Sequence, residues 1–159
     1  MIRIETADLS QRNQAEIFIE LLNAYANDPM GGGEPLAEQT RLNLVATLNT
    51  HSGATTILAY ADQLAIGLCN CFDAFSTFAC QPILNIHDIY VSETYRRQGV
   101  ARLLLNHAEQ IALDKGCCKM TLEVLNRNET AKSIYQQFGF KPYQLNENFG
   151  NAEFWQKDF

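Results

Sequence analysis

The sequence predicts a mixed α/β fold in which helices are interleaved among strands. Two patterns predict it: short alternating or β-rich apolar runs mark strands, and apolar residues recurring every three or four positions mark helices. Glycines and prolines punctuate the boundaries between these segments. In chain order the elements read strand, helix, helix, three strands, helix, strand, helix and two strands, which we interpret as one domain over residues 1–159.

The N-terminal third is predicted to hold one strand and two helices. Alternation of apolar and charged residues predicts the strand, and Asp8 or Ser10 can cap the first helix. The expected bounds are a strand over 1–6, a helix ending near Asn27, a glycine-rich loop over 28–35 and a helix from Pro35 to about Thr50.

The middle of the chain is predicted to form a hairpin, a further strand and a long helix. Val100, Leu104, Ala108 and Ile111 would share one face of that helix, and Gly116 is placed to end it. The expected bounds are strands over 55–61 and 64–75 with a turn at 62–63, a loop over 76–82, a strand through 86–91 and a helix from about 100 to 116.

The C-terminal part is predicted to add a strand, a shorter helix and two closing strands. Ala131, Ile134, Tyr135 and Phe138 recur with helical spacing, and Gly139 stops the helix. The expected bounds are a strand over 120–124, a helix beginning at 126–128, and strands over 140–143 and 152–157.

Composition narrows the function classes. The chain has 159 residues, 47% of them hydrophobic, and its net charge of −6 disfavours nucleic-acid binding. No apolar run is long enough to span a membrane and no secretory signal begins the chain, so we expect a cytoplasmic protein without membrane contact. The five cysteines include no C-x-x-C pair, which favours reduced thiols and no metal site.

The turn before the long helix is the most informative stretch. Residues 95–98 contain no Ser, Thr, Asp or Asn that could cap the first helical amides. Gly99 lets a ligand approach the backbone, and Arg96, Arg97 and Arg102 add positive charge to a helix end that favours anions. A phosphate or pyrophosphate would fit there; an ordinary hydrated helix start is the alternative.

Two segments resemble motifs of the GCN5-related N-acetyltransferases (GNAT). Arg96-x-x-Gly99-x-Ala101 after an apolar strand is similar to the family's acetyl-CoA-binding motif, and residues 122–140 are similar to the strand and helix that follow it. The resemblance implies a mostly antiparallel central sheet with flanking helices, the GNAT-like acyl-CoA N-acyltransferase fold. It also implies direct transfer of an acetyl group from acetyl-CoA to a primary amine of a small molecule or peptide.

The resemblance further implies where acetyl-CoA binds. The strand before the long helix would carry a bulge and splay from the next strand, and the pantetheine arm would fill the gap. The implied cofactor-binding residues are Ile89, Val91, Arg96, Arg97, Gln98, Gly99, Val100, Ala101, Arg102, Asn128 and Ser133. Asn128 could equally be a plain helix N-cap, and Ser133 could simply face solvent.

Two residues are the catalytic candidates. Tyr135 corresponds to the family tyrosine that protonates the departing thiolate, although periodicity alone predicts a core residue. His87 precedes Ile89 and Val91 by even steps, so we expect it on their face, where an imidazole could accept the amine proton. A core histidine is the other interpretation, and Asp88 is expected to point the other way.

The acceptor is predicted to lie among loop residues that include acids and aromatic rings. Asp28, Glu34 and Phe75 are the candidates, because acidic groups beside apolar walls suit an amine; hydrated loop acids are the alternative. A non-catalytic acyl-CoA-binding or regulatory module remains a second function class. A toxin that acetylates aminoacyl-tRNA is disfavoured by the acidic balance, and a homodimer is left open.

Overall fold

The computed structural model describes the backbone of residues 1–159 and every side chain except that of Glu147. Two compact units make up the chain, Met1–Leu122 and Glu123–Phe159.

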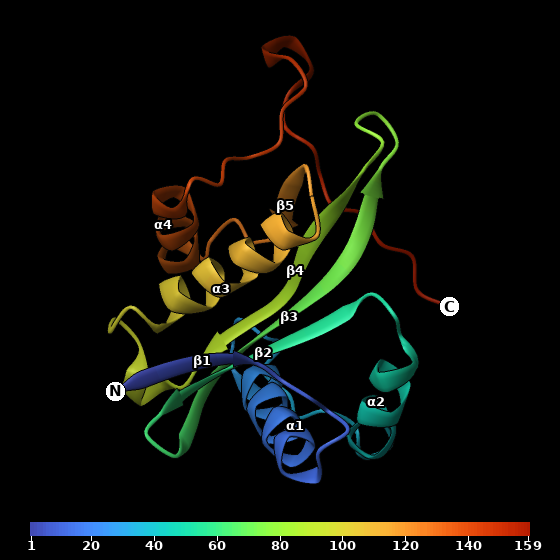
Figure 1. Cartoon of the computed structure of the whole chain (residues 1–159). Coiled ribbons are helices and arrows are strands. Elements are labelled where there is room, and N and C mark those ends of the chain that lie inside the picture. Colours follow the sequence, from blue (N-terminus) through green and yellow to red (C-terminus); the bar gives the residue numbers. More distant parts are fainter. The chain divides into compact units, whose positions relative to one another are not determined.

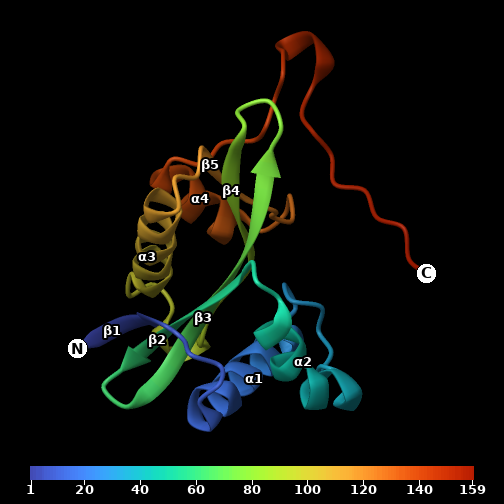
Figure 2. The same cartoon turned by 45° about the vertical axis from the view of Figure 1, so that its right-hand side comes forward.

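The first unit is a five-stranded sheet with helices on both faces. Helices α1 (Arg12–Asn27) and α2 (Glu38–Thr50) lie on one face, and α3 (Val100–Asp114) lies on the other (Figures 1 and 2). The strands, in their order across the sheet, are β1 (Ile2–Thr6), β2 (Ala54–Ala61), β3 (Leu64–Ser76), β4 (Gln81–Val91) and β5 (Lys119–Leu122). All neighbouring pairs are antiparallel except β4 and β5, which are parallel. The predicted mixed, mostly antiparallel class is therefore confirmed.

Alternation along β3 assigns its side chains to the two helical layers. Leu68 joins Leu21 of α1 in a buried cluster with Leu58 and Tyr60. The neighbouring Gly67 faces α3, because a Cβ there would lie 3.5 Å from the Leu104 side chain and 2.7 Å from the Tyr90 carbonyl oxygen. Even-numbered residues of this part of β3 thus face α1, and odd-numbered residues face α3.

Strand β4 contains a β-bulge at His87. Asp88 pairs with Asn70 of β3, whereas the next residue of β3, Cys71, pairs with Ile86. His87 is therefore the extra residue, and the alternation of β4 changes phase there.

The second unit contains the helix α4 (Glu129–Phe138) and a short 3-10 turn (Glu147–Phe149). The Asn128 side chain accepts the Ala131 amide proton at 3.1 Å and so caps α4, and Gly139, with φ +109°, ends the helix. Both boundaries agree with the predicted helix.

The two predicted closing strands, 140–143 and 152–157, do not form. In the described chain, an isolated bridge pairs Gln144 with Asn151, the residues that directly follow the first segment and precede the second. One hydrogen bond, from the Ala152 amide to the Tyr143 carbonyl, extends this bridge. Pro142 supplies no amide proton to a ladder, which explains why pairing does not extend through the first segment.

The predicted cap of the first helix is also wrong. Helix α1 begins at Arg12 after Gln11, too late for Asp8 or Ser10 to reach its first amides, and no side chain caps it. The Asp8 carboxylate instead accepts hydrogen bonds from Ser10 and Gln11, which lower its pKa. The second helix likewise begins later than predicted, at Glu38, so Pro35 belongs to the loop.

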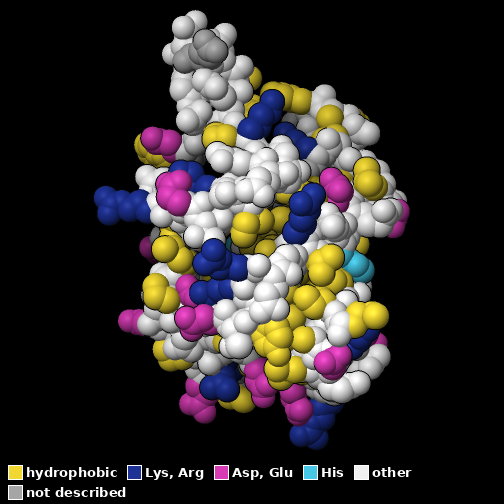
Figure 3. Space-filling view, turned by 90° about the vertical axis from the view of Figure 1, so that its left-hand side faces the viewer, with side chains coloured by type: hydrophobic (Ala, Val, Ile, Leu, Met, Phe, Trp, Pro, Cys, Tyr) yellow, Lys and Arg dark blue, Asp and Glu magenta, His cyan; other side chains and the backbone are white. Residues whose placement is uncertain are grey.

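No helix in the described part of the chain is both long and apolar enough to cross a membrane. Basic and acidic side chains are interspersed on the face shown in Figure 3. Among the described residues, no group of three or more His, Cys, Asp or Glu could hold a metal ion.

Candidate active site

The open edge of β4 is the first part of the candidate site. Pairing between β4 and β5 runs from Ile83 with Lys119 to Ile86 with Leu122 and stops at the bulge. The Ser92 amide donates to the Ile66 carbonyl of β3, so by alternation the backbone groups of Ile89 and Val91 point away from β3. These two residues, both predicted to contact pantetheine, thus direct their amides and carbonyls to an edge of β4 that no strand of the described sheet covers.

The turn that leads from β4 into α3 is the second part. Arg97 and Gly99 have φ angles of +62° and +84°, and no side chain caps the helix start at Gly99. The first intrahelical bond runs from Leu103 to the Gly99 carbonyl at 3.1 Å, so the amides of Val100 and Ala101 precede it. The predicted uncapped helix start is present, and it can accept an anion.

Arg96 joins this turn to the loop after α1. Its guanidinium donates to Asp28 Oδ2 at 2.6 Å and to the Val91 carbonyl at 3.0 Å. Asp28 also accepts the Met30 amide at 2.9 Å; this bond and the Arg96 contacts lower the pKa of Asp28, although burial opposes them. The structure therefore brings together one predicted cofactor-binding residue and one predicted acceptor-binding residue as an ion pair.

His87 does not share the face of Ile89 and Val91, so that expectation is wrong. The bulge reverses the alternation, and the His87 ring meets Phe72 edge to face with ring centroids 5.4 Å apart. Phe72 lies two residues from Asn70 and therefore on the α1 face of β3. His87 is exposed on that face, which does not fit the alternative of a buried core histidine.

Asp88 lies on the same face and ends a line of hydrogen bonds across three strands. The Thr56 hydroxyl of β2 donates to Asn70 Oδ1 of β3 at 2.9 Å, and Asn70 Nδ2 donates to Asp88 Oδ2 at 2.9 Å. Sequence reasoning missed this line because it assumed regular alternation in β4. The available signal was Asn70, an amide in the otherwise apolar run from Ile66 to Phe72.

Two tyrosines lie near this carboxylate. The Tyr25 and Tyr90 rings have centroids 5.9 Å apart, and Arg96 lies over the Tyr90 ring at 5.9 Å. Burial raises the pKa of Tyr25, and the negative charges of Asp88 and Asp28 raise it further. The site therefore combines aromatic surface with negative potential.

The candidate residues of the second unit belong to α4. Tyr135 is buried, 8% exposed, and its ring meets Phe140 at a centroid distance of 6.0 Å. Asn128 is the helix N-cap, and Ser133 is exposed and accepts a hydrogen bond from Gln137 at 3.1 Å.

The remaining acceptor candidates, Glu34 and Phe75, are exposed. Phe75 pairs with Pro82 near the far end of the β3–β4 hairpin, remote along these strands from the bulge. The structure does not bring it together with Asp28 or Asp88 in any contact among described residues.

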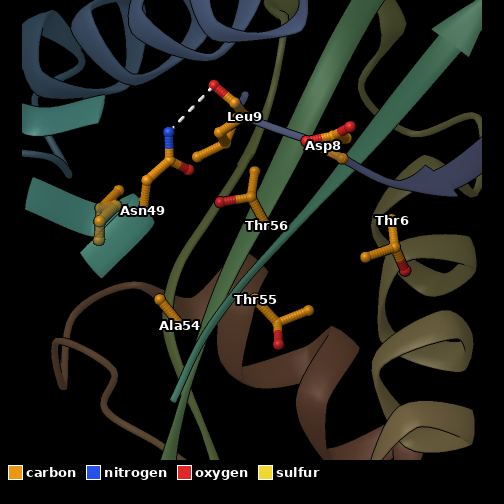
Figure 4. A pocket seen from close by; sticks show the side chains of 9 residues that line it. Thr6, Asp8, Leu9, Asn49, Ala54, Thr55 and Thr56 are labelled. Atoms are coloured by element: carbon orange, nitrogen blue, oxygen red, sulfur yellow. Dashed lines mark hydrogen bonds between the residues drawn. The ribbon is translucent and has the colours of Figure 1, made fainter. Parts of the chain in front are cut away.

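A hollow of about 210 Å³ lies where β1 ends and β2 begins (Figure 4). The Asn49 side chain donates to the Leu9 carbonyl at 3.3 Å across it. Its lining residues are Thr6, Ala7, Asp8, Leu9, Leu48, Asn49, Ala54, Thr55 and Thr56, none of which was predicted to belong to the site.

Comparison with known proteins decides the family. A sequence model of the acetyltransferase (GNAT) family matches residues 18–140. The chain belongs to this family. A solved structure described as a probable acetyltransferase is 28% identical to this GNAT chain, with a TM-score of 0.81 and 99% of both chains covered. The family and fold expected from the two motifs are thus confirmed.

Two further relatives of this GNAT chain have named activities or ligands. Thialysine N-epsilon-acetyltransferase of Bos taurus is 39% identical over 54 residues, a match that spans 34% of this chain and only 32% of that protein. The structure of AAC(6')-Iy in complex with the bisubstrate analog CoA-S-monomethyl-acetylneamine is 18% identical, with a TM-score of 0.78, and covers 100% of this chain and 99% of that one. At this identity the second likeness concerns the fold alone.

Proposed function

We propose that the chain is an acetyl-CoA-dependent N-acetyltransferase that acetylates a primary amine of a small molecule or peptide by direct transfer, and that residues 1–159 act as one GNAT domain. Family membership supports the reaction class. A relative named for acetylating thialysine, and a structure of the same fold in complex with a CoA bisubstrate analog, support the two substrates.

The observation that carries the proposal is that β4, with its open edge, leads along the chain into the uncapped start of α3. Ile89 offers both backbone groups and Val91 its amide for the amides of a pantetheine arm, since the Val91 carbonyl already accepts from Arg96; the uncapped amides after Gly99 suit a pyrophosphate. Arg97 and Arg102 add positive charge to this end. Arg96 is already paired with Asp28, so the proposal assigns less of the pyrophosphate binding to it.

In the proposed reaction, the amine nitrogen attacks the thioester carbonyl carbon, a C–N bond forms and the C–S bond breaks. The amine must lose a proton, because a free alkylamine with a pKa near ~10 is almost wholly protonated at neutral pH. His87 is proposed to accept that proton directly or through water, and Tyr135 to donate one to the departing thiolate. Asn128 retains its capping role and can contact CoA with its remaining polar groups.

The experiment is a screen of amine classes with acetyl-CoA, read by release of free thiol. Cys80 and Cys118 are exposed, so a Cys80→Ser/Cys118→Ser variant is needed to lower the background of a thiol reagent. Turnover with any amine class supports the proposal. Calorimetric binding of acetyl-CoA without turnover across the screen would instead identify an acyl-CoA-binding module.

A further inference from the structure

We propose that Asp88 is the anchor for the ammonium group of the acceptor, held in orientation by Asn70 and Thr56 and bordered by the rings of Tyr25 and Tyr90. This inference rests on the proposed function and names the residues that recognise its second substrate. The acceptor would therefore be an amine that is positively charged when it binds.

The line of hydrogen bonds from Thr56 has one consistent direction. A carboxylate can only accept, so Asn70 must turn its NH₂ group to Asp88 and its carbonyl to the Thr56 hydroxyl. Thr56 and Asn70 are 6% and 4% exposed, and polar groups are buried at a cost unless they are hydrogen-bonded. This buried pair fixes one oxygen of Asp88 and leaves the second oxygen for another donor.

Asp88 has no cationic partner among the residues that the structure describes. The neighbouring arginine, Arg96, pairs with Asp28 at 2.6 Å, and the hydrogen-bond partner of Asp88 is the neutral amide of Asn70 at 2.9 Å. A partly buried carboxylate with one neutral donor gains from a cation placed beside it. An ammonium group supplies that charge together with up to three N–H donors.

The surroundings of Asp88 suit an alkylammonium. Tyr90 pairs with Leu68 and Asp88 with Asn70, so both side chains project from β4 toward α1, where the Tyr25 ring lies 5.9 Å from that of Tyr90. Aromatic faces attract cations and also cover the apolar part of an amine.

The site adjoins the open edge of β4, which is proposed to bind the pantetheine arm. Ile89 lies between Asp88 and Tyr90, and its backbone groups point to the open edge of β4. An amine held by Asp88 therefore lies one residue along the strand from the proposed pantetheine contacts.

The first test compares Asp88→Asn with Asp73→Asn. Both changes remove one negative charge from the same sheet, but Asp73 lies on the α3 side and pairs with Lys115 at 2.6 Å. Loss of a charge-assisted hydrogen bond predicts that Asp88→Asn raises the KM for the amine about 10- to 100-fold, with the KM for acetyl-CoA unchanged. Asp73→Asn should change neither constant. An unchanged amine KM in Asp88→Asn, or an equal rise in both variants, overturns the proposal.

The second test addresses the positioning residues. Thr56→Val removes the hydroxyl that orients Asn70 at nearly constant shape, whereas Thr56→Ser keeps it. We expect the amine KM to rise in Thr56→Val and to return toward the wild-type value in Thr56→Ser. A rise of the same size in both variants would show that packing at Thr56, and not the hydroxyl, is responsible.

The closing experiment needs no turnover. The side-chain amide signals of Asn70 are followed by ¹H–¹⁵N NMR while ethylammonium chloride is added without acetyl-CoA, with n-propanol as the neutral control. A saturable shift with ethylammonium alone, lost in Asp88→Asn, supports the ammonium site. If that shift occurs but no amine is acetylated, the proposed transferase function fails while the site stands; if amines are acetylated and Asn70 does not respond, the ammonium site is wrong.

Discussion

Replacement of Gly99 by aspartate tests the proposed pyrophosphate site most directly, because the same helix supplies a matched control. Gly99 and Gly116 flank α3, have φ angles of +84° and +67°, and a Cβ at either position would meet no atom within 4 Å. Each substitution therefore adds the same charge and a similar left-handed backbone cost, on the order of 1 to 2 kcal/mol of stability. Only Gly99 adjoins the amides proposed to hold phosphate.

The expected effect on affinity follows from those amides. Val100, Ala101 and Arg102 precede the first intrahelical bond, from Leu103 to Gly99 at 3.1 Å, so their N–H groups are available to an anion. Loss of one hydrogen bond to a charged group costs about 1.5 to 3 kcal/mol. Gly99→Asp should thus weaken CoA binding at least about 10- to 100-fold, and Gly116→Asp should leave it nearly unchanged.

Titration calorimetry with CoA measures both affinities, and urea unfolding checks that both variants remain folded. Gly99→Asn and Gly116→Asn repeat the comparison without the added charge, and a smaller affinity loss in Gly99→Asn would assign the difference to repulsion. Equal CoA affinities in the two aspartate variants would refute the assignment of the pyrophosphate to the start of α3.

Three further substitutions test other parts of the site. Tyr135→Phe keeps the buried ring, so stability and CoA affinity should hold while the rate falls; an unchanged rate under chemistry-limited turnover returns Tyr135 to the core. His87→Ala should lower the rate on the order of 100- to 10,000-fold, and because the ring is exposed we expect little loss of thermal stability; an unchanged rate excludes His87 as the base. Asp28→Asn removes the ion pair with Arg96. Because the Arg96 side chain is half-exposed, we expect the loss of stability to be no more than about 1 kcal/mol. The pKa of Asp28 is lowered in the folded state. The stability difference between the wild type and Asp28→Asn should therefore reach its full size well above the ordinary pKa of 3.8 and vanish as the pH falls through the folded-state pKa. A constant difference in urea unfolding from about pH 7 to about pH 2 would contradict the assignment.

Local patterns predicted most of the fold. The hairpin of β2 and β3, the uncapped start of α3 and the Asn128 and Gly139 boundaries of α4 each depend on residues close together in sequence. The closing strands could not be judged in this way, because a strand needs a partner and Pro142 interrupts the ladder that the first would form. The pairing that these two predicted strands would need does not occur.

The candidate site was predictable where it depends on the backbone, at Gly99 and at the open edge of β4. The family resemblance predicted a bulge in this strand but not its position. Placement of His87 and Asp88 depends on that position, which is visible only in the register of β4 against β3. One extra residue changes which face a side chain occupies, so the even spacing of His87, Ile89 and Val91 was misleading. Asn70, a buried amide in an apolar strand, was the one local sign of a polar line across the sheet.

The bulge at His87 also affects how far β4 can pair with β5. If His87 were deleted, Ile86, Asp88 and Ile89 would alternate regularly, and Ile86 and Ile89 would keep the face that they already share toward α3. The apolar sequence of β4 is therefore that of an uninterrupted strand with one residue inserted. Such a strand could extend its pairing with β5 beyond Ile86, which would favour a more stable sheet and close the edge that is proposed to bind the pantetheine arm. Whatever the chemistry of its imidazole, His87 is thus the residue whose insertion shifts the register of β4 at the point where pairing with β5 stops.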